Sequence, residues 1–169
     1  NNQVFTLVRT SINQVANAAS QQVYEANQDI TKKYRYVATL DTRTSAICRA
    51  LDGREFEYGK GPTPPQHFNC RSTTRAVIDY EGLGLTPPPE GKRAAQGGMV
   101  PANETYGEWL YDGDSKTGRA RQAEVLGSKA PYFRKLSEKY GPKYAIAKFV
   151  RDDGSEVTLL QLRTPYGKL

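Results

Sequence analysis

The sequence predicts an α+β protein in which a long N-terminal helix is followed by a small β unit and then by a basic helical lobe with a C-terminal hairpin. Three observations support this class. Apolar residues recur at helical spacing near the N-terminus, both cysteines and the only histidine lie within residues 40–72, and an excess of positive charge is confined to residues 111–151. A chain of 169 residues is long enough for one domain or two small lobes.

The N-terminal helix is predicted between Val4 and Asn27. Its apolar residues are Val4, Leu7, Val8, Ile12, Val15, Ala16, Ala19 and Val23. Steps of three and four residues place them on one face of a helix. The other face carries Asn, Gln and Ser rather than charge, so the apolar stripe packs either on a partner protein or on the strands expected at Tyr34 and Ser72.

Two β-rich runs flank the segment that contains the cysteines. Residues 34–40 lead into it, and residues 72–80 leave it with an alternating pattern, so we expect the two runs to pair. Between them, Asp52 and Gly53 form a pair that accepts positive φ and predicts a tight hairpin turn before Phe56.

Four residues in this segment are candidate metal ligands. His67 and Cys70 form a His-x-x-Cys step, Cys48 precedes them, and Asp41 lies seven residues before Cys48. Zinc binds thiolate, imidazole and carboxylate ligands in tetrahedral sites. The pattern therefore predicts a structural Zn²⁺ held by Asp41, Cys48, His67 and Cys70, which makes this part a zinc-knotted β unit.

Other interpretations of the same residues stay open. Cys48 and Cys70 can form a structural disulfide. His67 can be a packed side chain without a metal, or it can form a catalytic pair with Cys48 as the nucleophile and Asp41 orienting the ring. A zinc deaminase is excluded, because it requires His-x-Glu and Pro-Cys-x-x-Cys motifs that the sequence does not contain.

Several motifs carry a resemblance to a known family. In the cysteine segment they are Asp41-x-Arg43-Thr44, Cys48, Leu51-Asp52-Gly53 and Pro64-Pro65-x-His67-x-x-Cys70-Arg71. Further along they are Gly98-x-Val100-Pro101, Tyr106-x-x-Trp109-Leu110, Val125-Leu126-Gly127 and Leu159-x-x-Leu162-Arg163. Over about Thr10 to Arg163 the chain thus resembles the phage Mu F-like head morphogenesis family of minor head proteins. One departure is Ser72, where many members have a further Cys.

The resemblance implies a non-enzymatic structural protein of the virion. Its expected partners are the phage portal or the major capsid protein, and its expected location is the capsid interior after assembly in the host cytoplasm. The N-terminal helix would then be the anchor that faces the portal or head. The alternatives are a metal-dependent hydrolase or nuclease-type toxin domain that uses the Cys/His/Asp cluster, and a nucleic-acid-binding zinc module.

The positive charge of the chain is unevenly distributed. Residues 111–151 contain 10 Lys and Arg against 4 Asp and Glu, a net charge of +6, whereas residues 1–110 contain 12 against 11. Such a block favours contacts with DNA phosphates without sequence specificity, although a solvated helix face has the same composition. The candidate residues for contact with packaged DNA are Arg119, Arg121, Lys129, Arg134, Lys135, Lys139 and Lys143.

Composition divides the chain into residues 1–81, a Pro- and Gly-rich linker or arm at 82–102, and the basic lobe at 103–169. Three helices are expected in the lobe. The first is capped by Asn103 and runs through Leu110, the second covers 119–126 and is ended by Gly127, and the third is capped by Ser128 and closed by Gly141. Residues 144–151 and 155–159 are expected to pair as a hairpin around Asp153-Gly154.

No run of residues approaches the roughly 18 apolar positions of a membrane span. The chain opens on two Asn residues rather than on Met, so we expect it to be part of a longer protein.

Overall fold

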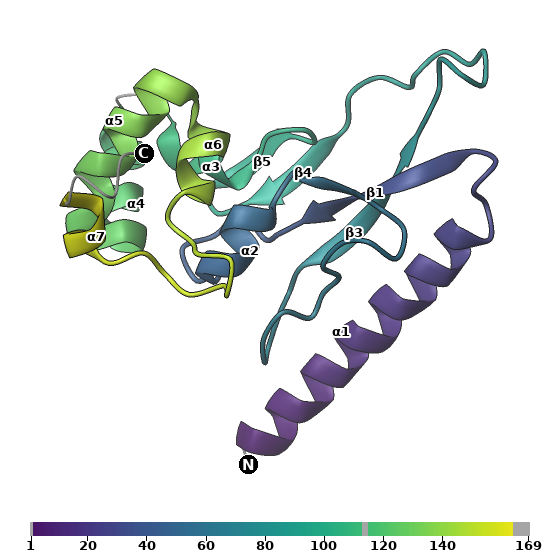
Figure 1. The fold of residues 1–169 in the computed structure, drawn as a ribbon, viewed down its shortest axis with the longest axis horizontal. Helices are drawn as coiled ribbons and strands as arrows, with labels where there is room; N and C mark the ends of the chain where they lie inside the picture. Colours follow the sequence, from purple (N-terminus) through teal and green to yellow (C-terminus); the bar gives the residue numbers. More distant parts are fainter. Residues whose placement is uncertain (1, 113–114, 164–169) are drawn as a thin grey trace. The chain divides into compact units, whose positions relative to one another are not determined.

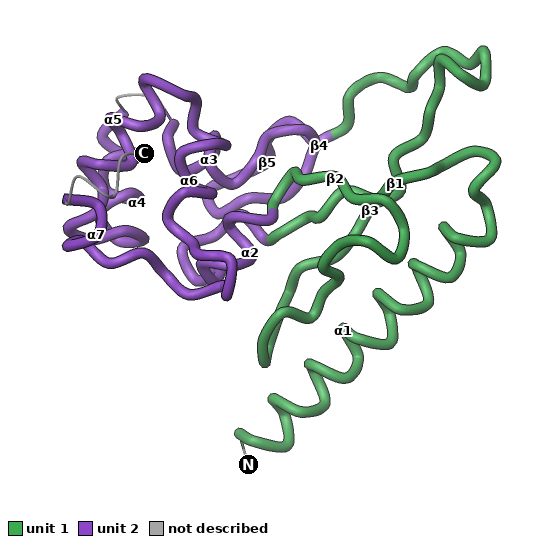
Figure 2. The backbone as a smooth tube through the Cα atoms, in the orientation of Figure 1, with its two compact units in different colours: residues 1–38, 52–91 green, residues 39–51, 92–169 purple. Residues whose placement is uncertain are grey.

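The computed structural model describes residues 2–112 and 115–163 and confirms the α+β class, with an N-terminal helix, small antiparallel sheets and a helical lobe (Figure 1). The chain forms two compact units. Unit 1 contains residues 1–38 and 52–91, and unit 2 contains residues 39–51 and 92–169 (Figure 2).

Unit 1 consists of one long helix and a three-stranded sheet. Its elements are α1 (Asn2–Glu25), β1 (Thr31–Val37), β2 (Glu55–Glu57) and β3 (Thr73–Ile78). The strands are antiparallel in the order β2-β1-β3, so β3 is an edge strand. The pairing of β1 with β3 confirms the predicted pairing of the two β-rich runs, and its register sets Tyr36 opposite Thr74.

The core of unit 1 is built from tyrosines. Tyr34 and Tyr36 on β1 are fully buried. The ring of Tyr34 lies 5.7 Å from that of Phe56 and 6.1 Å from that of Tyr58, measured between centroids, and its hydroxyl donates to the carbonyl of Pro62 at 3.2 Å. A tyrosine buries a large apolar ring while its hydroxyl keeps a hydrogen bond, so a chain poor in aliphatic residues can still form a core.

The turn before β2 is set by Asp52 and Gly53. Gly53 has a φ of 73°, which confirms the predicted positive φ, and its N–H donates to the carbonyl of Tyr36 at 2.9 Å. The carboxylate of Asp52, which is buried, accepts the N–H of Ala38 at 2.6 Å. These two bonds hold the start of β2 against the end of β1.

Helix α1 lies against the edge strand β3 with its polar face. The Asn13 amide donates to the carbonyl of Ser72 at 3.0 Å, and the Tyr24 hydroxyl donates to the carbonyl of Thr74 at 3.2 Å. Gln21 also donates to the Thr74 hydroxyl at 3.0 Å. The interpretation in which the apolar stripe packs on the strands is wrong, because the carbonyls of this edge need donors that only the polar face supplies.

Unit 2 is mostly helical and contains one short hairpin. Its elements are α2 (Ala46–Leu51), β4 (Lys92–Ala95), β5 (Gly98–Pro101), α3 (Tyr106–Tyr111), α4 (Lys116–Leu126), the 3₁₀ helix η1 (Gly127–Lys129), α5 (Ala130–Tyr140), α6 (Pro142–Ala147) and α7 (Leu159–Arg163). The hairpin of β4 and β5 falls inside the predicted linker at 82–102. It forms because Gln96 and Gly97 make a two-residue turn, with a φ of 104° at Gly97.

The predicted helices of the basic lobe are present with corrected boundaries. The N-cap of α3 is Thr105 rather than Asn103, because Thr105 forms a capping box with Glu108. Helix α4 begins earlier than predicted, since the Ser115 hydroxyl accepts the N–H of Gly118 at 2.8 Å. The predicted end of the third helix at Gly141 is confirmed.

The predicted C-terminal hairpin is reduced to a turn. The Arg151 N–H donates to the carbonyl of Ser155 at 2.8 Å, and one antiparallel bridge joins Val150 to Glu156. The predicted first strand is wrong over most of its length, because Pro142 starts α6 with the φ that a helical first turn requires.

The apolar core of unit 2 gathers around α3. Its buried residues are Leu40, Tyr106, Trp109, Leu110, Leu126, Ala130, Phe133, Ala145, Ile146, Phe149 and Leu162. Gln122 is fully buried beside them, and its amide donates to the carbonyls of Leu110 and Tyr111 at 3.2 and 2.8 Å. It thereby satisfies carbonyls that the end of α3 leaves without helical partners. No helix in the described part of the chain has both the length and the apolar character of a membrane span.

We predict that Gly107→Ala destabilises unit 2 by about 2 kcal/mol or more, because a Cβ at Gly107 would overlap the backbone carbonyl of Pro142. Chemical denaturation monitored by circular dichroism measures the change. The control is Gly91→Ala, where a Cβ meets no neighbouring atom, and it should stay within about 0.5 kcal/mol of the parent. Equal stability of the two variants would contradict the close approach of α3 and α6.

Candidate metal centre

Three of the four predicted ligands are supplied by different local structures. Cys48 lies on α2, Cys70 lies three residues before β3, and His67 lies in the loop that precedes Cys70. Both cysteines are buried and neither forms a disulfide in the part of the chain that the structure describes, whereas His67 is more exposed. The short helix that carries Cys48 was not predicted, because residues 46–51 are too few to show a helical period.

The structure brings Cys48, His67 and Cys70 together. Their two sulfur atoms and a ring nitrogen of the histidine all lie within 4.8 Å of one another. Zinc–sulfur bonds of about 2.3 Å and zinc–nitrogen bonds of about 2.0 Å require ligand atoms to be about 3.5–4 Å apart. These three residues could therefore hold a metal ion.

A backbone contact indicates which nitrogen of His67 is available to a metal. The Nδ1 atom lies 2.8 Å from the carbonyl oxygen of Phe68. A carbonyl oxygen only accepts hydrogen bonds, so Nδ1 carries the proton and the lone pair is on Nε2. A second hydrogen bond of this kind is what fixes the tautomer and orientation of metal-binding histidines.

Asp41, the fourth predicted ligand, is not a member of this group of three. Its carboxylate accepts the N–H of Arg43 at 3.1 Å and the hydroxyl of Thr44 at 3.0 Å. Its backbone carbonyl accepts the hydroxyl of Tyr106 at 2.9 Å. Burial raises the pKa of Tyr106 to about 12, so this hydroxyl stays protonated and remains a donor at neutral pH.

The seven predicted DNA-binding residues separate into two groups. Arg121, Lys129 and Arg134 are engaged within unit 2, where they bond to Asp112, Glu156 and Gln122 respectively. Arg119, Lys135, Lys139 and Lys143 are exposed on α4, α5 and α6. The second group differs from the first in that all four of its residues are classed as exposed.

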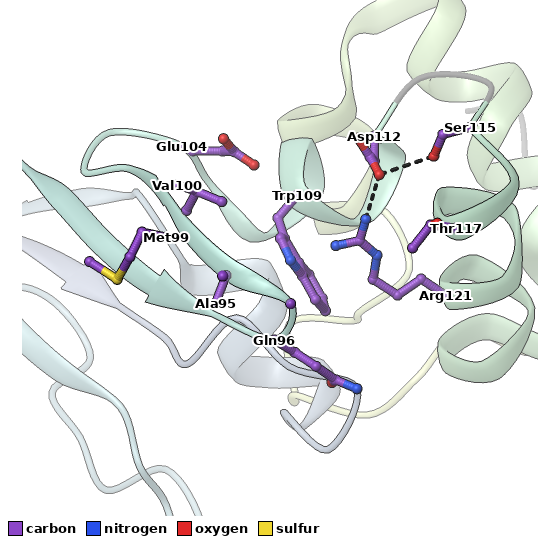
Figure 3. A pocket seen from close by; sticks show the side chains of 12 residues that line it. Ala95, Gln96, Met99, Val100, Glu104, Trp109, Asp112, Ser115, Thr117 and Arg121 are labelled. Atoms are coloured by element: carbon purple, nitrogen blue, oxygen red, sulfur yellow. Dashed lines mark hydrogen bonds and ion pairs between the residues drawn. The ribbon is translucent and has the colours of Figure 1, made fainter.

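A pocket of mixed polar and apolar lining in unit 2 was not predicted from the sequence. It has a volume of about 360 Å³ and lies beside the β4–β5 hairpin. Figure 3 shows the Arg121 side chain next to Trp109, with its guanidinium 4.4 Å from the indole centroid and 2.6 Å from the Asp112 carboxylate. Burial, followed by repulsion from Glu108 and Asp112, raises the pKa of the Glu104 carboxyl at its rim. No sequence motif identifies this pocket, because its residues come from separate elements without a fixed spacing.

Comparison with protein families gives one match. Residues 1–75 match the family described as Phage Mu protein F like protein. This match supports the phage Mu F-like family that the motifs of the cysteine segment resemble, and it includes all of the grouped ligands. The resemblance of the later motifs lies beyond the matched residues. Comparisons with curated proteins and with solved structures found no match.

We predict that the purified chain binds one Zn²⁺ and that Cys48→Ser and Cys70→Ser each abolish stoichiometric binding. A structural zinc contributes on the order of 10 kcal/mol to the folding of a small unit, so both variants and a chelator should lower the melting temperature by more than about 5 °C. Elemental analysis, a thiol count and thermal melting measure these effects. The control is Phe68→Ala, which removes an exposed side chain beside His67 and should keep the metal. Unchanged metal content in both cysteine variants would refute the site.

Proposed function

We propose that this chain is a bacteriophage minor head protein that acts in head morphogenesis. The observation that carries the proposal is the match of residues 1–75 to the phage Mu F-like family. A structural role in the head implies the portal or the major capsid protein as partner, and we propose a location in the capsid interior near the portal.

We propose that the metal of this protein is Zn²⁺ and that its role is structural. Two thiolates and an imidazole are soft and borderline ligands, which favour zinc over Mg²⁺ or Ca²⁺. A metal there would join Cys48 to the loop that holds His67 and Cys70, in a protein whose apolar residues make up 37% of the chain. A metal that crosslinks such segments supplies stability that a small core lacks.

Asp41 stays our prediction for the fourth ligand. Its carboxylate would have to exchange the hydrogen bonds from Arg43 and Thr44 for the metal. Asp41→Asn tests this role, because loss of a ligand should weaken zinc binding at least about 10-fold, whereas a neutral amide can preserve part of the loop contacts. Unchanged affinity would assign the fourth position to water.

The alternative is a metal-dependent hydrolase or a nuclease-type toxin domain. Catalytic zinc sites have three protein ligands and an open fourth position. A site formed by Cys48, His67 and Cys70 alone would have this arrangement, so the enzyme alternative can be tested. Such an enzyme also needs a general base near the metal. The chain has no second histidine, and the grouped ligands of the described residues include no carboxylate. Cleavage of plasmid DNA by the zinc-loaded protein, lost with Cys48→Ser, would favour the enzyme.

The head role is tested in particles of the phage that encodes the chain. Mass spectrometry of purified particles should detect the protein, and external protease should degrade it only after the heads are opened. Detection in lysates but never in purified heads would refute the proposed role.

We further propose that the exposed basic residues of unit 2 contact packaged DNA. They lie on three helices, α4, α5 and α6, which succeed one another along the chain. Charges that reach solvent can replace the counterions of DNA, whereas Arg121 and Lys129 are already paired with carboxylates.

We predict weak binding to double-stranded DNA that falls steeply between about 50 and 200 mM salt. Reversing Arg119, Lys135, Lys139 and Lys143 to Glu should lower the affinity at least about 100-fold and flatten the salt dependence. Fluorescence anisotropy with unrelated duplexes measures both effects.

The matched control for this prediction reverses four exposed basic residues elsewhere, Lys32, Lys33, Arg75 and Lys92, which gives the same change in net charge. An equal loss in both variants would show that only the net charge matters. No binding by the parent at low salt would show that the basic block is a solvated surface.

A further inference from the structure

The outward face of α1 is apolar. Its exposed apolar side chains are 46–69% accessible and comprise Val4, Phe5, Leu7, Val8, Ile12, Val15 and Val23. The inward face is formed by amides and hydroxyls that bond to Ser72 and to β3 of the same unit, and Asn17 is the buried residue of the helix. The usual amphipathic arrangement of a surface helix is therefore inverted.

The apolar surface of α1 is comparable to the largest patch found on a typical monomer, and such patches often serve in binding. Seven such side chains, each roughly half or more exposed, present on the order of 500 Å², close to the largest patch that monomers normally expose. Two such faces in contact would bury about 1,000 Å², which is the lower limit of a specific interface. The face is thus large enough for a dimer of this chain.

The spacing of the apolar residues is that of a helix pair. Phe5, Val8, Ile12, Val15 and Ala19 follow one another at alternating steps of three and four residues, which places them along a single straight seam. The only charged residues of α1 are Arg9 and Glu25, so the helix has no net charge that would repel a second copy.

We propose that α1 is a self-association surface and that two copies of this chain pair through it in antiparallel orientation. The direction follows from the sizes of the side chains along the seam. If Ile12 of one copy lies beside Val15 of its partner, Val8 falls opposite Ala19 and Val4 falls opposite Val23. Val8 then meets the smaller Ala19 and Ile12 meets the smaller Val15, whereas a parallel pair would set Ile12 against Ile12 and leave Ala19 against Ala19.

This pairing differs from the head-facing anchor that the sequence alone suggested for the helix. The occupant of the apolar face is a second copy of the chain, because the seam is complementary to itself. The inference does not depend on the proposed head function, and it concerns residues 2–25 of the purified protein.

Light scattering coupled to size-exclusion chromatography tests the pairing. The parent should have about twice the 18.8 kDa mass of one chain at micromolar concentration. Ile12→Glu places two like charges at the centre of the interface and should raise the dissociation constant at least about 100-fold. Ile12 is exposed, so its substitution should leave the far-ultraviolet circular dichroism unchanged.

The matched control is Gln14→Glu. Gln14 is also exposed, but it lies about 200° around the helix from Ile12, so it should leave the dimer intact. A monomeric parent, or a dimer that survives Ile12→Glu, would overturn the proposal, and so would equal dissociation by both variants.

A distance measurement tests the direction. A nitroxide attached through a bioorthogonal side chain at Gln3 spares both cysteines. In the antiparallel pair the two labels should be about 30 Å apart, since 21 residues separate Gln3 from its opposite position at about 1.5 Å per residue. Labels about 10 Å apart would indicate a parallel pair and overturn this arrangement.

Discussion

The open edge of β3 is the constraint on which the arrangement of unit 1 depends. Tyr36 uses its backbone groups toward β2, where its N–H donates to Arg54 and its carbonyl accepts from Gly53. Its partner Thr74 therefore directs its own carbonyl away from the sheet, where a donor is needed. Helix α1 supplies that donor from Tyr24, and the requirement for polar side chains on its inner face leaves its apolar residues outside.

Both units compensate for a small supply of aliphatic residues by burying groups that combine apolar area with hydrogen bonds. In unit 1 Tyr34 is such a group, and in unit 2 Tyr106 and Gln122 are. Each buried polar atom then needs a partner, since an unsatisfied group costs about 1–3 kcal/mol. A core of this kind favours one arrangement of its side chains, because few alternative packings would give each buried polar atom a hydrogen-bond partner.

The fold class, the long helix and the pairing of β1 with β3 could be predicted, because each follows from a local period or from turn residues such as Asp52 and Gly53. The side of α1 that faces the sheet could not be predicted. Periodicity identifies two faces, but only the hydrogen-bonding needs of β3 decide which one turns inward. The β4–β5 hairpin was missed because the prolines and glycines around it are typical of a linker, and its strands are only four residues long.

For the candidate site too, the residue types could be used for prediction, but the surroundings of each residue could not be read from the sequence. Cys48, His67 and Cys70 could be selected as candidates from residue type and spacing, and the structure groups their ligand atoms. Asp41 stays a prediction as the fourth ligand, because a carboxylate can also cap a loop, and here it accepts hydrogen bonds from Arg43 and Thr44. Charge counting has a similar limit. It gives Arg121 and Lys135 equal weight, yet Arg121 is held between Trp109 and Asp112 whereas Lys135 is exposed. A positive segment thus contains both structural and solvent-facing charges, and a count of charges does not separate them.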